Sequence, residues 1–467
     1  MDVEHRVRTM ALAGAALCTM TAIGQADELS ALKAELAALE NRIAELEATA
    51  PRAAAVPEGA GLITYYRGTD TASDWTVDRA GESIPTARGF TIAVTPSADF
   101  PVPVHEVTIS GYVKGDFIYD FKRDVGDYFA YSDLDFRRHH RHLRLHARQS
   151  RFRIQSKSDT EIGQIRTLIE GDFFSGGAYG NTDFRLRHAW GEWDMTPNWT
   201  FGAGQTWRNF MSLITGITTV DFFGPAGLIG TSRVGQVRLT YRDGPHVFAI
   251  SAEDPTGEGD WLNGFGHNDV MADFAARWQY DAAGGHKFLV SGATRYFETT
   301  RRRGAIRSDD ALGWVIQGAA TINLADYATF STSVIYGNGA GNYIAGNGPA
   351  YWVHQDTGHI SLISALGLFA GVGVPLTETT SFNFGWGMVV ADREDIKGGI
   401  LRGGVGSGEI VREVMSFHGN IIWKPVNELH LGWEIIYGER EYHHIADAGR
   451  IRRDDNVRGQ FGAWFFF

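Results

Sequence analysis

Seven arginines of this sequence stand in strand-length runs where polar and apolar residues alternate: Arg144, Arg148, Arg151, Arg185, Arg187, Arg238 and Arg277. Alternate side chains of a strand point to opposite faces, so the apolar residues of each run share one face and the arginines share the other. A guanidinium group is a planar fork of N–H donors that binds carboxylates through paired hydrogen bonds. A wall that carries these arginines would therefore attract small anions.

The arginine runs also predict two local details. Apolar neighbours at odd-numbered positions place the even-numbered Arg144 and Arg148 on one face of the strand. Phe152, at an even-numbered position, places the odd-numbered Arg151 on that same face. One regular strand cannot hold both sets, so we predict a bulge or break near Gln149. In the run 184–188 the outward residues would be Phe184, Leu186 and His188, with Arg185 and Arg187 between them.

The connection over residues 209–231 is the second candidate for a functional element. It is poor in charge and is interrupted by glycine and proline, with Asp221, Phe222, Phe223, Gly224 and Pro225 at its centre. Such a loop suits a segment folded into a lumen, where it packs on the wall and narrows a pore. The alternative is an ordinary surface loop with a hydrophobic patch.

Residues for other chemistries are present but poorly arranged. The run 137–142 is rich in histidine and arginine, yet no carboxylate or cysteine completes a metal-ligand spacing. The glycine-rich stretch 403–408 lacks the strand-to-helix transition of a nucleotide-binding loop. Ser416 and His418 invite comparison with an outer-membrane lipase, but residues two apart on a strand merely share a face. We expect no enzyme activity, no catalytic residue, no metal and no cofactor.

The elements that position these residues are short strands. From residue 107 onward, runs of alternating polarity are separated in turn by tight turns and by longer polar loops. In the clearest run, 381–391, Phe382, Phe384 and Trp386 share one face while Asn383 and Gly385 share the other. The partition gives about sixteen strands and predicts an all-β fold, a 16-stranded antiparallel transmembrane β-barrel over residues 106–467.

Composition favours the same fold. The mean hydropathy is -0.19, and beyond residue 30 the sequence has no run of about 18 apolar residues, which excludes a membrane-spanning helix. Barrel strands expose only alternate residues to lipid, so a modest hydropathy is compatible with them. A soluble β-sandwich or propeller is the alternative. Aromatic residues near strand ends, such as Trp314 and Tyr437, are instead typical of membrane-interface girdles.

The final run, 456–467, ends in Phe465, Phe466 and Phe467. Alternation places Phe465 and Phe467 toward lipid, and Gln460 and Trp464 toward the lumen or the seam. We predict that this strand is the sixteenth and closes the sheet against the first strand, near 107–121, so that no free edge remains in the membrane. Both barrel ends would then lie in the periplasm.

The segments before the barrel do not show the alternating pattern of strands. Residues 1–26 read as a signal peptide, with Arg6 and Arg8 before an apolar run and small residues at the cleavage site. A lipoprotein anchor on Cys18 is the alternative. Residues 27–48 carry a 3-4-3-4-3 apolar spacing that predicts a coiled-coil helix, or else a single amphipathic helix on the barrel. Residues 49–105 read as a linker and a periplasmic segment of unknown fold, in which 90–94 could be a strand.

Several longer motifs resemble the DcaP-like trimeric outer-membrane porins. They are the runs 147–152 (ARQSRF), 169–173 (IEGDF), 184–190 (FRLRHAW), 204–211 (GQTWRNFM) and 221–227 (DFFGPAG). The likeness covers roughly residues 110–241 and the N-terminal layout, whereas 61–104 departs from the family pattern. The resemblance implies a trimer of sixteen-stranded barrels, an inward third loop, and passage of small anionic solutes such as dicarboxylates. It also places Arg151 at the constriction.

Together these observations predict a porin of the bacterial outer membrane, a passive channel that prefers anions. Its partners would be two further copies of the chain, outer-membrane lipids, lipopolysaccharide and small anionic solutes. Part of the arginines, with the run 137–142, would instead bind lipopolysaccharide phosphates at the rim. The competing function is an envelope tether whose coiled coil contacts peptidoglycan. The net charge of -12 disfavours nucleic acid as a partner.

Overall fold

The computed structural model describes residues 62–67, 89–95, 105–134, 140–175, 182–228, 233–255, 266–300, 309–354, 356–401, 409–444 and 450–467. The predicted signal peptide (1–26) and coiled-coil helix (27–48) lie outside the described residues. Within the described ranges, no helix has the length and apolar character needed to cross a membrane.

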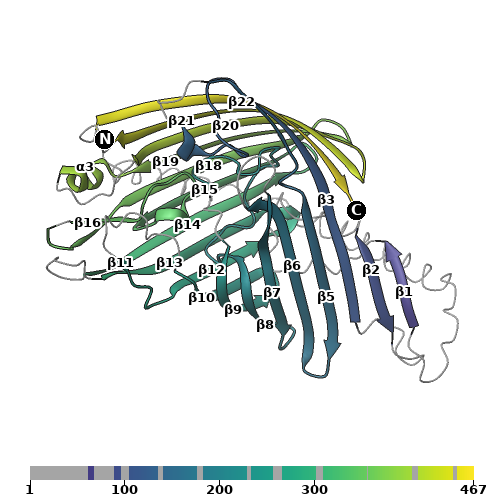
Figure 1. The fold of residues 1–467 in the computed structure, drawn as a ribbon. Helices are drawn as coiled ribbons and strands as arrows, with labels where there is room; N and C mark the ends of the chain where they lie inside the picture. Colours follow the sequence, from purple (N-terminus) through teal and green to yellow (C-terminus); the bar gives the residue numbers. More distant parts are fainter. Residues whose placement is uncertain are drawn as a thin grey trace, which may run out of the picture. The chain divides into compact units, whose positions relative to one another are not determined.

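Sixteen strands form one closed antiparallel barrel (Figure 1). Each strand pairs with the next, and the last pairs with the first, so the ring has no open edge. In order around the ring they are β3 (His105–Asp120), β5 (Arg151–Thr160), β6 (Gly163–Ser175), β7 (Asp183–Asp194), β8 (Trp199–Trp207), β9 (Arg233–Asp243), β10 (His246–Glu253), β12 (Asp273–Asp281), β13 (Lys287–Thr300), β14 (Asp310–Leu324), β15 (Ala328–Asn338), β18 (Ser364–Pro375), β19 (Thr380–Ala391), β20 (Glu409–Val426), β21 (Leu429–His444) and β22 (Arg450–Phe466).

Short turns and long loops alternate around the barrel as predicted. The two-residue turns 161–162, 244–245 and 427–428 lie at the end where β3 begins, and the long connections lie at the other end. Alternation along each strand also holds. On β22, Phe465 is 53% exposed on the outer face, whereas Trp464 is 8% exposed on the inner face. The predicted closure by the C-terminal strand is confirmed, since Phe461 pairs with Phe117 of β3.

The predicted break near Gln149 is confirmed. β4 (His142–His146) and β5 pair with successive parts of β3, and residues 147–150 separate them. Leu145 of β4 and Phe152 of β5 are both exposed on the outer face. The interruption therefore keeps the arginines of both segments on the inner face, although they occupy even-numbered positions in β4 and odd-numbered positions in β5.

A bulge in β7 corrects one prediction. The register between β6 and β7 shifts so that His188 pairs with Glu170 and Leu186 pairs with Gly171, and Arg187 is left between them. Arg187 and His188 are in consequence both buried. The expectation that His188 lies on the outer face is wrong, because a bulge delivers two consecutive side chains to the same side.

The smaller elements lie in the connections and before the barrel. β1 (Leu62–Arg67) pairs with β2 (Phe90–Thr95), and β2 pairs with the start of β3, which confirms the strand suggested for 90–94. β11 (Gly266–His267) pairs with β13, and β16 (Tyr351–Val353) pairs with β17 (Ile360–Leu362). The helix α3 (Arg393–Leu401) begins after Asp392, whose Oδ1 accepts the N–H of Glu394 at 2.8 Å as an N-cap.

The largest apolar cluster lies inside the ring. Loop residues such as Phe129, Phe210 and Tyr343 pack there against wall residues such as Val315 and Val389. A soluble sandwich would place its core between two sheets. Here a single closed sheet encloses loops, and its outer face carries exposed aromatic and aliphatic side chains on every part of the wall.

Candidate functional site

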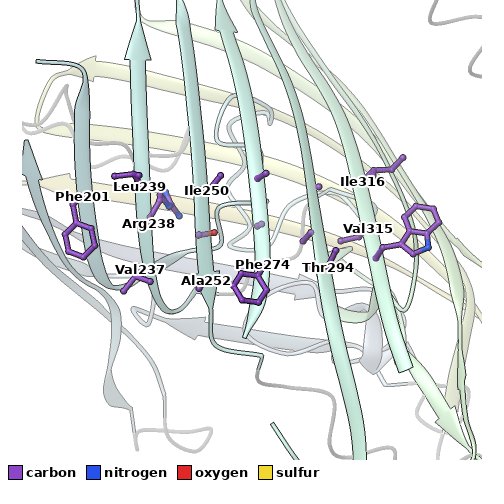
Figure 2. Close-up of a pocket in the computed structure, with 16 residues that line it drawn as sticks. Phe201, Val237, Arg238, Leu239, Ile250, Ala252, Phe274, Thr294, Val315 and Ile316 are labelled. Carbon is purple, nitrogen blue, oxygen red and sulfur yellow. The ribbon is translucent and has the colours of Figure 1, made fainter. Parts of the chain in front are cut away.

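A hollow of about 900 Å³ lies on the outer face of the wall from β8 to β14. Its lining is largely apolar and includes Phe201, Val237 and Phe274 (Figure 2). Arg238 belongs to the same stretch, but its side chain leaves β9 in a different direction from that of Leu239 (Figure 2). Arg238 is 2% exposed and Val237 is 49% exposed. The hollow is therefore part of the apolar outer surface, and the candidate site for hydrophilic solutes is the lumen.

The loop over residues 208–228, here the constriction loop, crosses the interior of the barrel. Four strands that are spread around the ring donate hydrogen bonds to its carbonyl groups. The donors and acceptors are Ser291 to Phe210 at 2.8 Å, Thr321 to Ile214 at 2.6 Å, Asn420 to Thr218 at 2.8 Å and Lys114 to Val220 at 2.6 Å. The predicted central residues, 221–225, therefore lie inside the ring.

Glu434 of β21 holds the tip of the constriction loop. Its Oε2 accepts the backbone N–H of Asp221 at 2.7 Å and also that of Val220. Its Oε1 lies 2.9 Å from Nδ1 of His418, and both side chains are fully buried. Hydrogen bonds to a charged acceptor are among the strong ones, so this carboxylate is the main anchor of the tip. Sequence reasoning did not identify Glu434.

A second loop, residues 121–134, also folds into the barrel and packs on the constriction loop. Asp221 accepts the N–H of Phe129 at 2.9 Å, and the Tyr131 hydroxyl donates to Gly224 O at 2.8 Å. Arg458 of β22 donates to Gly126 O at 2.7 Å. Burial raises the pKa of Tyr131, so its hydroxyl stays protonated and keeps donating. The sequence predicted only a long connection here. The apolar residues within 125–134 could have indicated that this loop is buried inside the barrel.

The loop over residues 339–363 is the third inward segment. Ala345 and the constriction loop exchange two backbone hydrogen bonds, Gly227 N–H to Ala345 O at 2.9 Å and Ala345 N–H to Leu228 O at 2.8 Å. Gly227 has a φ of +71°, and a Cβ there would lie 2.2 Å from Met388 O. Only glycine fits such a left-handed position against a strand backbone. Among the connections that the structure describes, three loops, and not one, narrow the lumen.

Four aromatic rings gather where these loops meet β6, and all four are half-buried. Phe222 lies 4.3 Å from Phe174 between ring centroids, and Phe223 stacks on Tyr128 at 5.4 Å. Arg185 lies over Phe174 at 5.4 Å and over Phe222 at 5.5 Å. Guanidinium groups are attracted to aromatic faces. The two phenylalanines predicted at the loop centre thus form an aromatic contact surface with the early strands.

The arginines of β5 and β7 are neutralised by two carboxylates of β6. Glu170 lies 2.7 Å from Nε of both Arg153 and Arg187, and 3.8 Å from Arg151. Asp172 lies 2.7 Å from Arg185 and 3.0 Å from Arg187. The residues Arg151, Arg153, Arg185, Arg187, Glu170 and Asp172 are called the Glu170 cluster below. Four guanidinium groups share two carboxylates, so the cluster is a positively charged patch whose field is roughly halved by its own anions.

Arg144 and Arg148 lie nearer the long loops and share one carboxylate. Both form ion pairs with Asp127, and Arg144 also lies 2.7 Å from Asp124. Burial works to raise the pKa of Asp127, but the hydrogen bond from Arg144 and the charges of Arg144 and Arg148 outweigh it and hold this pKa below its ordinary value. Asp127 therefore stays ionised and cancels part of the positive charge.

Arg238 and Arg277 differ from the other five predicted arginines. Both are buried, and neither forms an ion pair with any described residue. Arg238 donates to Gln236 Oε1 at 2.7 Å and to Trp207 O at 2.7 Å. Arg277 makes no hydrogen bond within the described chain, and its Nε and Nη1 lack acceptors. Arg242 lies on the same inner face of β9, four residues after Arg238, and is half-buried. Its side chain also forms no ion pair with a described residue.

All seven predicted arginines lie on the side of the wall away from the exposed apolar residues. Arg148, Arg151, Arg187, Arg238 and Arg277 are buried, and Arg144 and Arg185 are half-buried. The wall brings them together in three groups and not in one ring. The first group pairs with Asp127, the second pairs with Glu170 and Asp172, and the third forms no ion pair with a described residue. Among the described residues no group of metal-ligating side chains is found.

A closed, tilted barrel whose lumen is narrowed by inward loops defines the class: the fold is that of outer-membrane channels. No protein-family model and no curated protein matches the chain by sequence. Among solved structures it is similar to the outer-membrane channel DcaP of Acinetobacter baumannii, with a TM-score of 0.67 and 23% identity over 78% of this chain and 97% of that one. It is also similar to the anion-selective porin from Comamonas acidovorans, with a TM-score of 0.52, 13% identity, and coverage of 78% and 100%. At these low identities the structural likeness shows a shared fold.

Proposed function

We propose that this chain is a porin of the bacterial outer membrane, a passive diffusion channel for small hydrophilic solutes. The observation that carries the proposal is the pairing of an apolar outer face with a charged interior inside one closed sheet. Such a sheet leaves no backbone group unpaired in lipid. The inward loops described above restrict the lumen without closing it to small solutes, which suits diffusion. The likeness in fold to DcaP supports membership of the DcaP-like porins.

The channel prefers anions, dicarboxylates among them. The support is the distribution of charge inside the barrel: guanidinium groups outnumber carboxylates in the Glu170 cluster, and Arg238 and Arg277 form no ion pair with a described residue. Cations would be repelled at each of these places, whereas a carboxylate could be bound by a guanidinium fork. The run 137–142, of which the structure describes 140–142, and other rim arginines would contact lipopolysaccharide, and the working assembly would be a homotrimer.

Conductance in a planar bilayer tests the function. With a salt gradient across the membrane, the reversal potential should show anion preference. Replacing Arg151, Arg187 and Arg238 together by glutamine should shift it toward zero selectivity, because three positive charges leave the lumen. The matched control is Arg453→Gln, which removes one positive charge from the outer face, where the side chain is 60% exposed.

The control should keep the selectivity of the unaltered chain. A strongly cation-selective reversal potential would contradict the anion preference. Absence of any conductance from a correctly folded barrel would contradict the channel itself. Unchanged selectivity in the triple variant would mean that these side chains do not face the path of the ions.

A further inference from the structure

The ring of His418, on the inner face of β20, is fully buried between two side chains that hold the inward loops. Its Nδ1 lies 2.9 Å from Oε1 of Glu434, and its Nε2 lies 3.3 Å from the hydroxyl oxygen of Tyr131. Glu434 anchors the tip of the constriction loop, whereas Tyr131 belongs to the loop 121–134. One imidazole ring therefore connects the supports of two inward loops.

The hydroxyl hydrogen of Tyr131 is already used in another hydrogen bond. Gly224 O can only accept, so the contact of 2.8 Å between it and the Tyr131 hydroxyl takes that hydrogen. Ser416 Oγ accepts the N–H of Ala226 at 2.9 Å, and its own hydrogen serves the contact of 2.9 Å with Tyr131. Toward His418 the Tyr131 oxygen can therefore only accept. The hydrogen in the contact between Tyr131 and His418 has to be carried by Nε2.

The other ring nitrogen of His418, Nδ1, faces a carboxylate. Oε2 of Glu434 accepts two backbone N–H groups of the constriction loop, and its Oε1 lies 2.9 Å from Nδ1. A carboxylate can only accept, so Nδ1 carries a hydrogen as well. A ring with hydrogens on both nitrogens is an imidazolium, and its hydrogen bond to Glu434 is charge-assisted. A neutral ring would instead place the lone pair of Nε2 against a lone pair of Tyr131.

The ion pairs around the loop tip agree with an imidazolium at His418. The other buried carboxylates there have cations of their own, which are Lys114 for Asp116, at 2.8 Å, and Arg458 for Asp120 and Asp221, at 2.9 and 3.4 Å.

Among the described residues, His418 is the cation that remains for Glu434, and both side chains are 0% exposed. The register partners of His418, Gly385 of β19 and Ile436 of β21, add no charge. A buried carboxylate without a cation is costly, so a proton on His418 stabilises Glu434 in place.

We propose that His418 is a positioning residue whose second ring hydrogen clamps the constriction loop and the loop 121–134 to β20. The inference rests on the proposed channel, because these loops set its width. As pH rises, His418 loses one ring hydrogen, so that Nε2 stops donating to Tyr131 and Glu434 loses its cation. The clamp is therefore complete at low pH and is lost as pH rises through the titration of His418. The lumen should widen toward alkaline pH.

The pH dependence of single-channel conductance tests the clamp in the full-length chain. Between mildly acidic and mildly alkaline pH, the range in which imidazole titrates, conductance and open-channel noise should rise. His418→Gln should lose this rise and conduct at the alkaline level at every pH, because glutamine has no proton to release. His105→Gln is the matched control, since it removes an exposed histidine at the start of β3, and it should keep the rise.

Nitrogen NMR of a chain with isotope-labelled histidine reads the proton directly and needs no conducting channel. At neutral pH the signal that disappears in His418→Gln should come from a ring with hydrogens on both nitrogens. If His418→Gln fails to fold, as judged by heat-modifiable migration on gels, Tyr131→Phe is the second variant. It removes the acceptor of the Nε2 hydrogen, so the loss of the ring hydrogen should move to lower pH.

A conducting chain whose conductance does not change with pH overturns the clamp, and so does an unchanged rise in folded His418→Gln. A neutral His418 ring at neutral pH in a chain that conducts keeps the channel and loses the clamp. A doubly protonated ring in a folded chain that does not conduct keeps the clamp and loses the channel.

Discussion

At the scale of single residues, the partner of each charge decides what the charge does. Arg153 and Arg187 are held by Glu170, so they stabilise the wall, and part of their positive charge is cancelled there. Removing one member of a buried ion pair costs about 3–5 kcal/mol, since the other charge stays buried. Arg277 forms no ion pair with a described residue, and its Nε and Nη1 have no acceptor. The positive field in the lumen is therefore weaker than the number of arginines suggests, because only the arginines without an ion pair contribute their full charge to it.

Glu434→Gln is the sharpest test at this scale. The amide oxygen of glutamine can still accept the two N–H groups that share Oε2, but it lacks the negative charge, and a charged hydrogen bond contributes about 1.5–3 kcal/mol against about 1 kcal/mol for a neutral one. The loop tip should loosen, so single-channel conductance and open-channel noise should both rise. Limited proteolysis within 208–228 should become faster.

The control is Glu378→Gln, which removes an exposed carboxylate from the turn between β18 and β19. It should leave conductance and proteolysis unchanged. If Glu434→Gln also behaves like the unaltered chain, then the wall hydrogen bonds from Ser291, Thr321 and Lys114 suffice to hold the loop.

At the scale of elements, the lumen is shaped by loops that return to strands far away in sequence. The constriction loop follows β8 but is anchored on β13, β14, β20, β21 and β3. The loop 121–134 follows β3 but binds β20, β21 and β22. Each anchor joins wall and loop, so the width of the channel depends on the closed ring as a whole.

The end of β22 offers the test for elements. Phe467 and Gly111 exchange two backbone hydrogen bonds, and Phe466 pairs with Tyr112. Deleting residues 464–467 should leave this part of β3 unpaired on that side, and an open edge is not tolerated in lipid. We expect loss of the heat-resistant folded band on gels. Phe467→Tyr keeps the backbone and an aromatic ring and should fold normally. A truncated chain that folds and conducts would show that β2 or another segment seals the seam.

At the scale of the whole molecule, a closed barrel places the start of β3 and the end of β22 at the same rim, the rim with the short turns. The segment that precedes β3 therefore leaves from that rim. We expect this rim to face the periplasm, where residues 27–48 could join three copies of the chain or reach peptidoglycan.

Deleting residues 27–48 distinguishes the two roles. If these residues specify the oligomer, trimers should disappear from native gels while each barrel still conducts. If they tether the envelope, trimers should persist and the outer membrane should lose its attachment to peptidoglycan in co-sedimentation. Unchanged trimers together with unchanged attachment would leave residues 27–48 without either role.

The sequence alone determined the barrel, its strand number, the alternation of turns and loops, the break near Gln149 and closure by the last strand. All of these follow from a local rule, since the two-residue period of a strand is written in neighbouring residues. The same rule predicted which face each arginine takes. It failed at His188, where a bulge changed the period.

Only the tertiary structure decided which of those arginines is neutralised. Glu170 and Glu434 acquire their roles from strands that the ring brings beside loops and arginines distant in sequence. Electrostatic and hydrogen-bonding partners are set by distance in space, which the local period of a strand does not encode. For that reason the sequence could predict a basic wall, while the structure was needed to show which of its arginines are held by carboxylates and that Arg277 is not.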